Sequence, residues 1–136
     1  MNIIILCRAN ACRSQMAEGL FRKHLGDKHN VFSAGLEPEE VNPNAIKTMA
    51  EIGIDISSHT SKTVDELPNV EFDYVITVCN SAKERCPVIP GNHNSIHHWF
   101  PDPSKVIGTD EEVAAAFAEV RDEIEAYVNK FVEGLG

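Results

Sequence analysis

Residues 2–14, NIIILCRANACRS, decide the fold of this chain. Residues 2–6 are almost wholly apolar, which predicts a buried strand of a parallel sheet. From Ser14 onward, the run SQMAEGLF predicts a helix. The loop between them therefore lies at the N-terminus of a helix, where unpaired backbone N–H groups attract anions.

Cys7 and Arg13 frame this loop, with five residues between them. A helix N-terminus and a nearby guanidinium both favour a thiolate, and the Ser14 hydroxyl can donate a hydrogen bond to it. The paired donors of Arg13 fit a tetrahedral oxyanion. We expect Cys7 to be ionised at neutral pH and to attack a bound oxyanion. The alternative for Cys7 is a small buried apolar residue that ends a strand.

The length and composition of the chain limit the number of domains and the classes of function that it can have. With 136 residues, 43% of them hydrophobic, and no linker or repeat, the chain is expected to form one domain over residues 1–136. The net charge of -9 argues against a nucleic-acid or membrane-surface role. The apolar start is too short for a signal peptide, and no segment reaches the ~20 apolar residues of a membrane span. We expect a soluble, cytoplasmic monomer. In such a protein, four cysteines are more typical of catalytic, redox or metal sites than of a disulfide framework.

Strands and helices alternate along the rest of the chain. Strands are predicted at residues 2–6, 30–35, 72–78 and 95–99, and helices at 14–25, at 42–53 and after a capping box at 109–112. This order predicts an α/β fold with a small four-stranded parallel sheet flanked by helices. Cys7, Cys79 and Asp102 then meet at the carboxyl edge of the sheet, where open α/β folds bind ligands.

Several short motifs share one resemblance. They are the loop from Cys7 to Ser14, the run SQMAEG at 14–19, the triplet HTS at 59–61, the pair Cys79 and Cys86 with Pro87, the dipeptide HW at 98–99 and the dipeptide DP at 102–103. With these motifs the chain resembles the thioredoxin-coupled arsenate reductases, which share the fold of the low-molecular-weight protein tyrosine phosphatases. The most specific part of the resemblance is the pair Cys79 and Cys86, because the loop alone does not separate a reductase from a phosphatase.

The resemblance implies a role for each matching residue. Cys7 attacks arsenate, Ser14 supports its thiolate, and Asp102 protonates the departing oxygen. The oxygens of the substrate are held by Arg13 and by the backbone amides of Arg8, Ala9, Asn10, Ala11 and Cys12. Cys79 then attacks Cys7, which releases arsenite and leaves a Cys7–Cys79 disulfide. Cys86 next forms a Cys79–Cys86 disulfide that thioredoxin reduces, and no bound cofactor or metal is implied.

Two other functions are compatible with the same residues. The first is a phosphatase acting on phosphotyrosine or small phosphoesters through Cys7, Arg13 and Asp102; Ser104 argues against it, because phosphatases of this fold commonly carry an aromatic residue there. The second is a sensor that binds zinc or arsenite through Cys79, Cys86 and the pair His97-His98. The spacing of these four residues does not match common zinc sites. Asp102, which lies between Pro101 and Pro103, is alternatively a plain turn aspartate.

The chain departs from the family pattern at two positions. Ala9 stands where the family loop usually has glycine, which costs about 1 kcal/mol if that position has a positive φ. Asn10 tolerates the left-handed region. Some family members hold potassium near the residues that match Asn10, Glu18 and Ser33, with an acidic residue where this chain has Lys62. We expect the Lys62 ammonium to replace that cation, and we expect Cys12 to be structural.

The spacing of the cysteine pair carries one further expectation. If residues 79–86 formed a continuous helix, their terminal Cα atoms would lie roughly 10 Å apart. A disulfide needs them within about 7 Å. We therefore expect oxidation of Cys79 and Cys86 to change the local structure, and Pro87 to prevent the helix from continuing.

Overall fold

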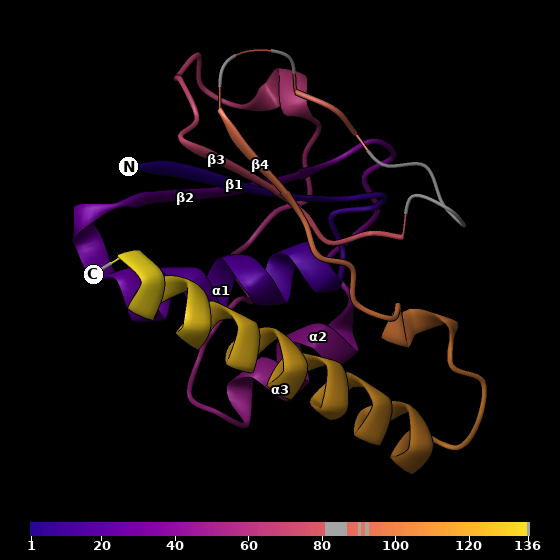
Figure 1. Cartoon of the computed structure of the whole chain (residues 1–136). Coiled ribbons are helices and arrows are strands. Elements are labelled where there is room, and N and C mark those ends of the chain that lie inside the picture. Colours follow the sequence, from indigo (N-terminus) through magenta and orange to yellow (C-terminus); the bar gives the residue numbers. More distant parts are fainter. Residues whose placement is uncertain (81–86, 90, 92, 136) are drawn as a thin grey trace.

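The sheet of this protein is parallel throughout (Figure 1). The computed structural model describes residues 1–80, 87–89, 91 and 93–135. Its strands are β1 (Asn2–Cys7), β2 (Asn30–Gly35), β3 (Tyr74–Thr77) and β4 (Asn94–His97), in the order β2-β1-β3-β4. Its helices are α1 (Arg13–Leu25), α2 (Pro43–Ala50) and α3 (Asp110–Leu135), with short 3-10 turns η1 (Gly26–Lys28), η2 (Val64–Glu66) and η3 (Pro103–Lys105). The predicted α/β fold with four parallel strands is confirmed.

β1 is apolar on both faces because both faces are covered. Ile3 and Ile5 are fully buried in the larger cluster, which includes side chains of α1 and α3. Ile4 and Leu6 face the other way and pack with Ala34 of β2 and Val75 of β3. Successive strand residues point to opposite faces, so a strand covered on both sides needs the continuous apolar run seen in the sequence.

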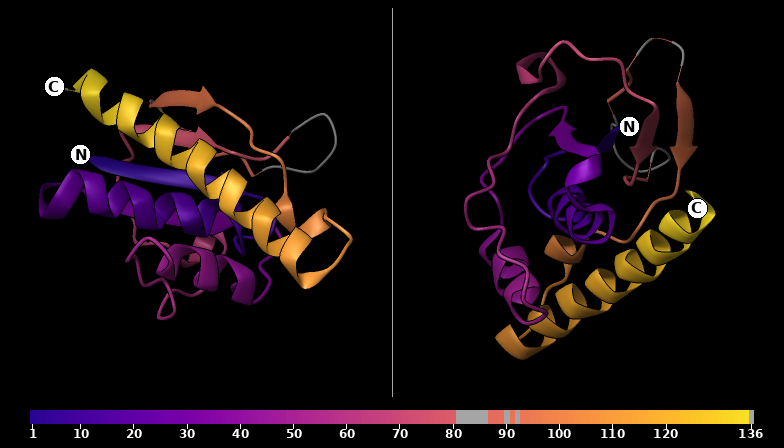
Figure 2. Two further views of the ribbon diagram at one scale, coloured as in Figure 1. Left: turned by 90° about the horizontal axis from the view of Figure 1, so that it is seen from below. Right: turned by 90° about the vertical axis from the view of Figure 1, so that its left-hand side faces the viewer.

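The three helices pack on one side of the sheet (Figures 1 and 2). α1 is buried from Arg13 to Phe21, and α3 packs across α1 and α2. α3 begins with the predicted capping box, in which the Glu112 amide donates to Thr109 Oγ1 and Thr109 N donates to Glu112 Oε1. The fully or nearly fully buried residues of α3 are Phe117, Val120, Ile124 and Val128.

The ends of some elements differ from the sequence-based prediction. β3 is shorter than predicted, although Val78 N still donates to Leu6 O at 2.9 Å. α2 begins as expected, with the Asn42 side chain accepting from Asn44 N at 2.8 Å, but it ends at Ala50. The turn that follows reaches Gly53 with a φ of 78°. Helix and strand ends are set by tertiary hydrogen bonds that local patterns do not encode.

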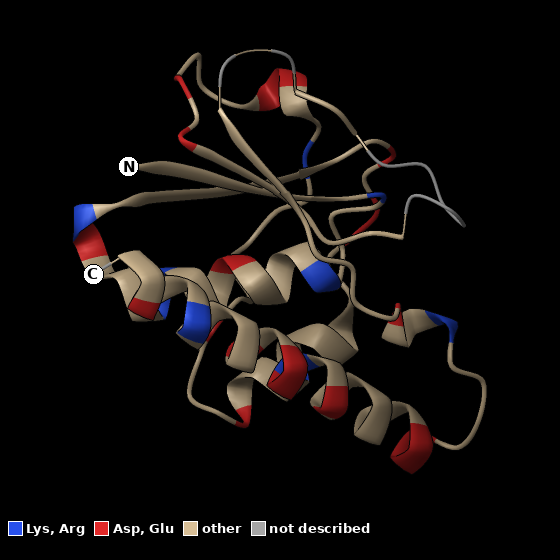
Figure 3. Ribbon diagram, in the orientation of Figure 1, with Lys and Arg blue, Asp and Glu red and all other residues tan. Residues whose placement is uncertain are grey.

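The charges are distributed unevenly over the fold (Figure 3). Acidic positions recur along α3, whereas basic positions lie at both ends of α1 and in the loop after β1. Within the described residues, no helix combines the length and the apolar character needed to cross a membrane.

The carboxyl ends of the strands lie level with one another. Leu6 pairs with Ala34 of β2 and Thr77 of β3, so the chain leaves all three strands at one edge. Gly35 lies opposite Cys7 at this edge. A Cβ atom on Gly35 would lie 2.7 Å from Arg8 O and 2.9 Å from Asn10 N. Only glycine therefore allows β2 to lie this close to the loop after β1.

Candidate active site

The loop at residues 7–13, here called the anion loop, lines a cavity of about 80 Å³ at the carboxyl edge of the sheet. The residues around this cavity are Cys7, Arg8, Ala9, Ala11, Cys12, Arg13, Glu39, Glu40, Asn42, Asp102 and Ser104. The fold therefore brings Asp102 to the anion loop from about 90 positions away in the sequence. It does so because β1 and β4 are parallel strands that end at the same edge of the sheet, and Asp102 follows β4.

The sulfur of Cys7 is buried and makes hydrogen bonds with two groups. Asn10 N donates to Cys7 Sγ at 3.3 Å, and Ser14 Oγ lies 2.9 Å from the same sulfur. The Asn10 side-chain amide donates to Ser14 Oγ at 2.8 Å, so the hydroxyl proton of Ser14 remains available for the sulfur. Donors directed at a sulfur favour its anionic form.

Asn10 is the centre of the hydrogen bonds that shape the loop. Its φ is 51°, the one positive value among the described residues other than glycine. Its side-chain amide also donates to Ser33 Oγ at 2.9 Å, and its side-chain oxygen accepts from Lys62 N at 3.0 Å. Its backbone oxygen accepts from Gln15 Nε2 and Ser61 Oγ. The left-handed residue is thus Asn10 and not Ala9, so the strain considered for Ala9 does not arise.

The segment at residues 36–42, here called the clasp segment, is hydrogen-bonded along the anion loop. Leu36 N and Glu37 N donate to Arg8 O at 2.8 and 2.9 Å. Glu39 N and Asn42 N donate to the carbonyls of Ala9 and Ala11, each at 3.0 Å. These bonds engage the carbonyl groups of the loop, which would otherwise repel an anion.

Arg13 and Asp102 lie together at the cavity. Arg13 Nη2 is 3.5 Å from Asp102 Oδ2, and Arg13 Nη1 donates to Phe100 O at 3.2 Å. Asp102 Oδ1 accepts from Ser104 N at 3.0 Å and from Ser104 Oγ at 2.6 Å. Asp102 is therefore a turn aspartate and a cavity residue at once. The turn fixes its carboxyl group beside the guanidinium of Arg13 in the lining of the cavity.

Cys12 is the N-cap residue of α1 and a free thiol. Burial raises the pKa of Cys12 to about 12, and the charges of Asp102 and Cys7 act in the same direction. The thiol of Cys12 is therefore neutral at pH 7, and a neutral thiol is a poor nucleophile. The geometry fits the structural role expected for this residue.

Cys79 follows β3 and is fully buried in the same apolar cluster as Cys7. Cys79 is disulfide-bonded, whereas Cys7 and Cys12 are free. Cys86 lies outside the described residues, so its role and the expected change of residues 79–86 on oxidation stay predictions.

His98, one member of the alternative metal site, is stacked on Tyr127, with the ring centroids 4.4 Å apart. Among the residues that the structure describes, no group of three or more His, Cys, Asp or Glu side chains is arranged to hold a metal ion.

A second polar cluster lies behind the anion loop. Ser33 Oγ donates to Glu18 Oε1 at 2.6 Å, and Arg22 Nε lies 3.0 Å from Glu18 Oε2. His59 Nε2 is 3.7 Å from the same carboxylate oxygen, and Lys62 Nζ donates to Thr60 O at 2.9 Å. Arg22 was not predicted as part of this cluster, although its place four residues after Glu18 is typical of a helical ion pair.

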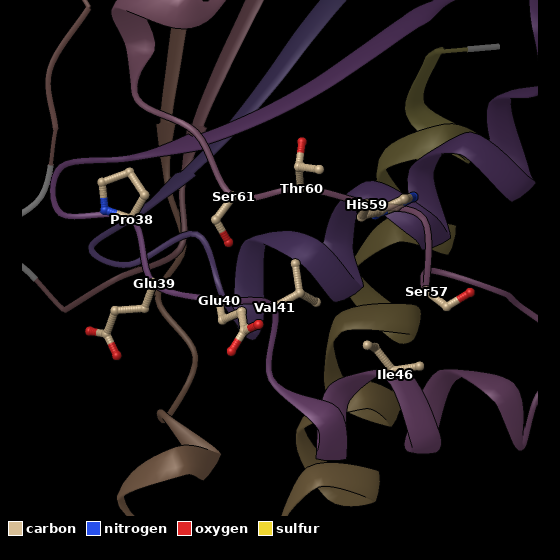
Figure 4. A pocket seen from close by; sticks show the side chains of 9 residues that line it. All are labelled: Pro38, Glu39, Glu40, Val41, Ile46, Ser57, His59, Thr60 and Ser61. Atoms are coloured by element: carbon tan, nitrogen blue, oxygen red, sulfur yellow. The ribbon is translucent and has the colours of Figure 1, made fainter.

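A larger, open cavity of about 470 Å³ adjoins the anion cavity and was not predicted (Figure 4). Residues 38–41 of the clasp segment form one wall, and Ser57 with residues 59–61 forms the other. Glu39 and Glu40 line both cavities. Both walls are hydrogen-bonded to the anion loop, so this cavity lies between the two segments that hold that loop in place.

Comparisons with known proteins agree with this geometry. Residues 2–136 match the family described as low molecular weight phosphotyrosine protein phosphatase. An arsenate reductase of Halalkalibacterium halodurans is 51% identical over 131 residues, which are 96% of this chain and 94% of the relative. A solved arsenate reductase in the phosphate binding state is 29% identical with a TM-score of 0.76, covering 99% of this chain and 98% of that chain.

A third relative is the thioredoxin-dependent arsenate reductase of Corynebacterium glutamicum. Its structure is 25% identical with a TM-score of 0.71, and the match covers 98% of this chain and 60% of that chain. The chain therefore belongs to the low molecular weight phosphotyrosine protein phosphatase family, and the curated relative described above is named an arsenate reductase.

Proposed function

We propose that this protein is an enzyme that reduces arsenate to arsenite, with Cys7 as nucleophile and thioredoxin as electron donor. One observation carries the proposal: the sulfur of Cys7 lies in a small cavity with Ser14 Oγ at 2.9 Å, Asn10 N at 3.3 Å and Arg13 on the same cavity wall. The relatives named arsenate reductase support the choice of substrate. The proposal includes a monomer in the cytoplasm, where thiols are kept reduced.

The first step is the attack of Cys7 on arsenic. Arg13 and the backbone amides of the anion loop hold the arsenate oxygens, because their donors match a tetrahedral anion. The sulfur of Cys7 forms a bond to arsenic while one As–O bond breaks. The departing oxygen takes a proton from Asp102 and leaves as water. The place of Asp102 in the lining of the cavity that holds Cys7 supports this role.

The second step transfers two electrons to arsenic. The thiolate of Cys79 attacks the sulfur of Cys7, the S–As bond breaks, and its electron pair stays on arsenic, which leaves as arsenite. The product on the protein is a Cys7–Cys79 disulfide. Cys86 then attacks Cys79 and releases Cys7, and thioredoxin reduces the Cys79–Cys86 disulfide. The burial of Cys79 in the same cluster as Cys7, and its disulfide-bonded state, support this relay.

The second candidate function is hydrolysis of phosphoesters through a phosphocysteine at Cys7. The family name favours it, because the same loop that fits arsenate also fits phosphate. Against it, the described lining of the anion cavity contains no aromatic side chain that would pack on a tyrosyl ring. Ser104 occupies the rim instead.

NADPH oxidation, measured with thioredoxin, thioredoxin reductase and arsenate, tests the proposal. The wild type should turn over many times. Cys86→Ser should release about one arsenite per protein and then stop, because the Cys7–Cys79 disulfide accumulates. Cys7→Ser should release none. The absence of arsenate-dependent oxidation, together with Cys7-dependent hydrolysis of p-nitrophenyl phosphate, would assign the protein as a phosphatase.

A further inference from the structure

Two charged side chains from different segments meet at the mouth of the anion cavity. Arg8 follows the nucleophile in the anion loop, and Glu39 belongs to the clasp segment. Arg8 Nη2 lies 2.9 Å from Glu39 Oε2, and both residues line the cavity that holds Cys7 and Arg13. The side chain of Arg8 is 26% exposed and that of Glu39 is 60% exposed, so the pair lies at the surface of the opening.

The backbones that carry this pair are fixed to one another. Leu36 N and Glu37 N donate to Arg8 O, and Glu39 N donates to Ala9 O. An exposed ion pair usually contributes less than about 1 kcal/mol to stability, partly because ordering two long side chains costs entropy. Here the main-chain bonds already hold the two residues side by side. The ion pair therefore adds little to stability. Its position in the lining of the anion cavity points instead to an effect on which molecules can enter.

The size and charge of the entrance limit what can enter. The anion cavity, at about 80 Å³, is far below the roughly 300–1,000 Å³ of sites that enclose organic ligands. Of the described residues, only Glu39 and Glu40 line both this cavity and the adjoining one of about 470 Å³, so an organic group would reach the larger space past these two carboxylates. Three carboxylates line the anion cavity, from Glu39, Glu40 and Asp102. Of the two arginines in its lining, Arg8 is paired with Glu39, and Arg13 lies against Asp102. A phosphate ester would have to pass its organic group between these acidic side chains.

We propose that the Arg8–Glu39 pair is a specificity element that restricts the anion site to small inorganic tetrahedral oxyanions and excludes phosphate esters. Glu39 holds the guanidinium of Arg8 over the opening, so the space that an ester group needs is occupied. The inference rests on the proposed function and deepens it, because it explains how a loop that fits any phosphate-like group selects a free oxyanion.

Protection of Cys7 from alkylation tests this selectivity without relying on turnover. Reduced protein is treated with iodoacetamide in the presence of inorganic phosphate or phenyl phosphate, and the Cys7 peptide is quantified by mass spectrometry. Arg8→Ala and Glu39→Ala should each raise the affinity for phenyl phosphate relative to inorganic phosphate by about tenfold, since removing a steric and charge barrier has effects of this order. Glu39→Asp, which keeps the charge, should retain most of the wild-type preference.

Glu37→Ala is the matched control, because Glu37 is an acidic residue of the same clasp segment that does not line the cavity. Its affinity ratio should equal that of the wild type. An unchanged ratio in both Arg8→Ala and Glu39→Ala, with folding intact by circular dichroism, would overturn the proposal. A wild type that reduces no arsenate, together with the expected shift of the ratio in Arg8→Ala and Glu39→Ala, would instead count against the proposed function alone.

Discussion

The hydroxyl oxygen of Ser14 lies 2.9 Å from the sulfur of Cys7, across the anion loop. The contact joins the end of β1 to the start of the helix that follows it. Because Asn10 donates to the same hydroxyl oxygen, the proton of Ser14 is directed at the sulfur. The reactivity of Cys7 should therefore depend on Ser14.

Ser14→Ala should slow the alkylation of Cys7 by iodoacetamide at pH 7 by about tenfold. A hydrogen bond to a charged group contributes about 1.5–3 kcal/mol, and Ser14→Ala removes the hydroxyl that lies 2.9 Å from the attacking sulfur. The rate is followed by mass spectrometry of the Cys7 peptide. Ser57→Ala is the control, because the Ser57 hydroxyl bonds to Asp55 and not to the loop. Equal rates for both variants would contradict the role of Ser14.

Asp102→Asn should lower the turnover of arsenate by about a hundredfold, the usual range for removal of a general acid. The side chain keeps its size and its turn, so binding of the anion should survive. Protection of Cys7 by inorganic phosphate, measured alongside turnover, separates the two effects. An unchanged turnover number would remove Asp102 from the mechanism.

Asn10→Ala should reduce the free energy of unfolding by about 3 kcal/mol. The change removes buried side-chain hydrogen bonds to Ser14, Ser33 and Lys62 and forces alanine into a positive φ. Asn10→Gly should lose about 1 kcal/mol less, because glycine adopts this conformation freely. Urea unfolding measures both. The exposed Asn44→Ala serves as control, and a loss as large as that of Asn10→Ala there would show that the hydrogen bonds of Asn10 are not the cause.

His59 should make stability depend on pH. Burial lowers the pKa of His59 below its ordinary value of 6.5, with Glu18 acting in the opposite direction. Between the folded-state pKa and 6.5, the unfolded chain binds more protons than the folded one, so the free energy of unfolding falls as the pH is lowered through this window. His59→Gln should flatten the curve there, whereas the exposed His97→Gln should not. Parallel curves for wild type and His59→Gln would refute this.

Potassium should leave the Michaelis constant for arsenate unchanged. Lys62 Nζ donates to Thr60 O at 2.9 Å, and the Glu18 carboxylate is already paired with Arg22. We expect these cations of the protein to replace the ion that some family members hold. Steady-state kinetics in KCl and NaCl at equal ionic strength measure the effect. A marked drop in the Michaelis constant with potassium alone would show that Lys62 does not replace the cation.

Much of the fold follows from local patterns. The apolar run before Cys7, the capping box at Thr109 and the cap at Asn42 each act over a few residues, and the structure contains all three. The spacing of Cys7 and Arg13, with a strand before and a helix after, was enough to predict an oxyanion site. These features can be predicted from the sequence because strand patterns, helix capping and loop length depend on neighbouring residues.

Other features depend on contacts between distant segments, and only the tertiary structure decided them. The positive φ belongs to Asn10 and not to Ala9 because Ser33 and Lys62, which are distant in sequence, hold the Asn10 side chain. The pairing of Arg8 with Glu39 requires β2 to pass beside the anion loop at Gly35. The sequence alone determined the order of the elements and the chemistry of the loop. The tertiary structure determined which side chains meet there, because such contacts depend on how the strands pair and not on spacing along the chain.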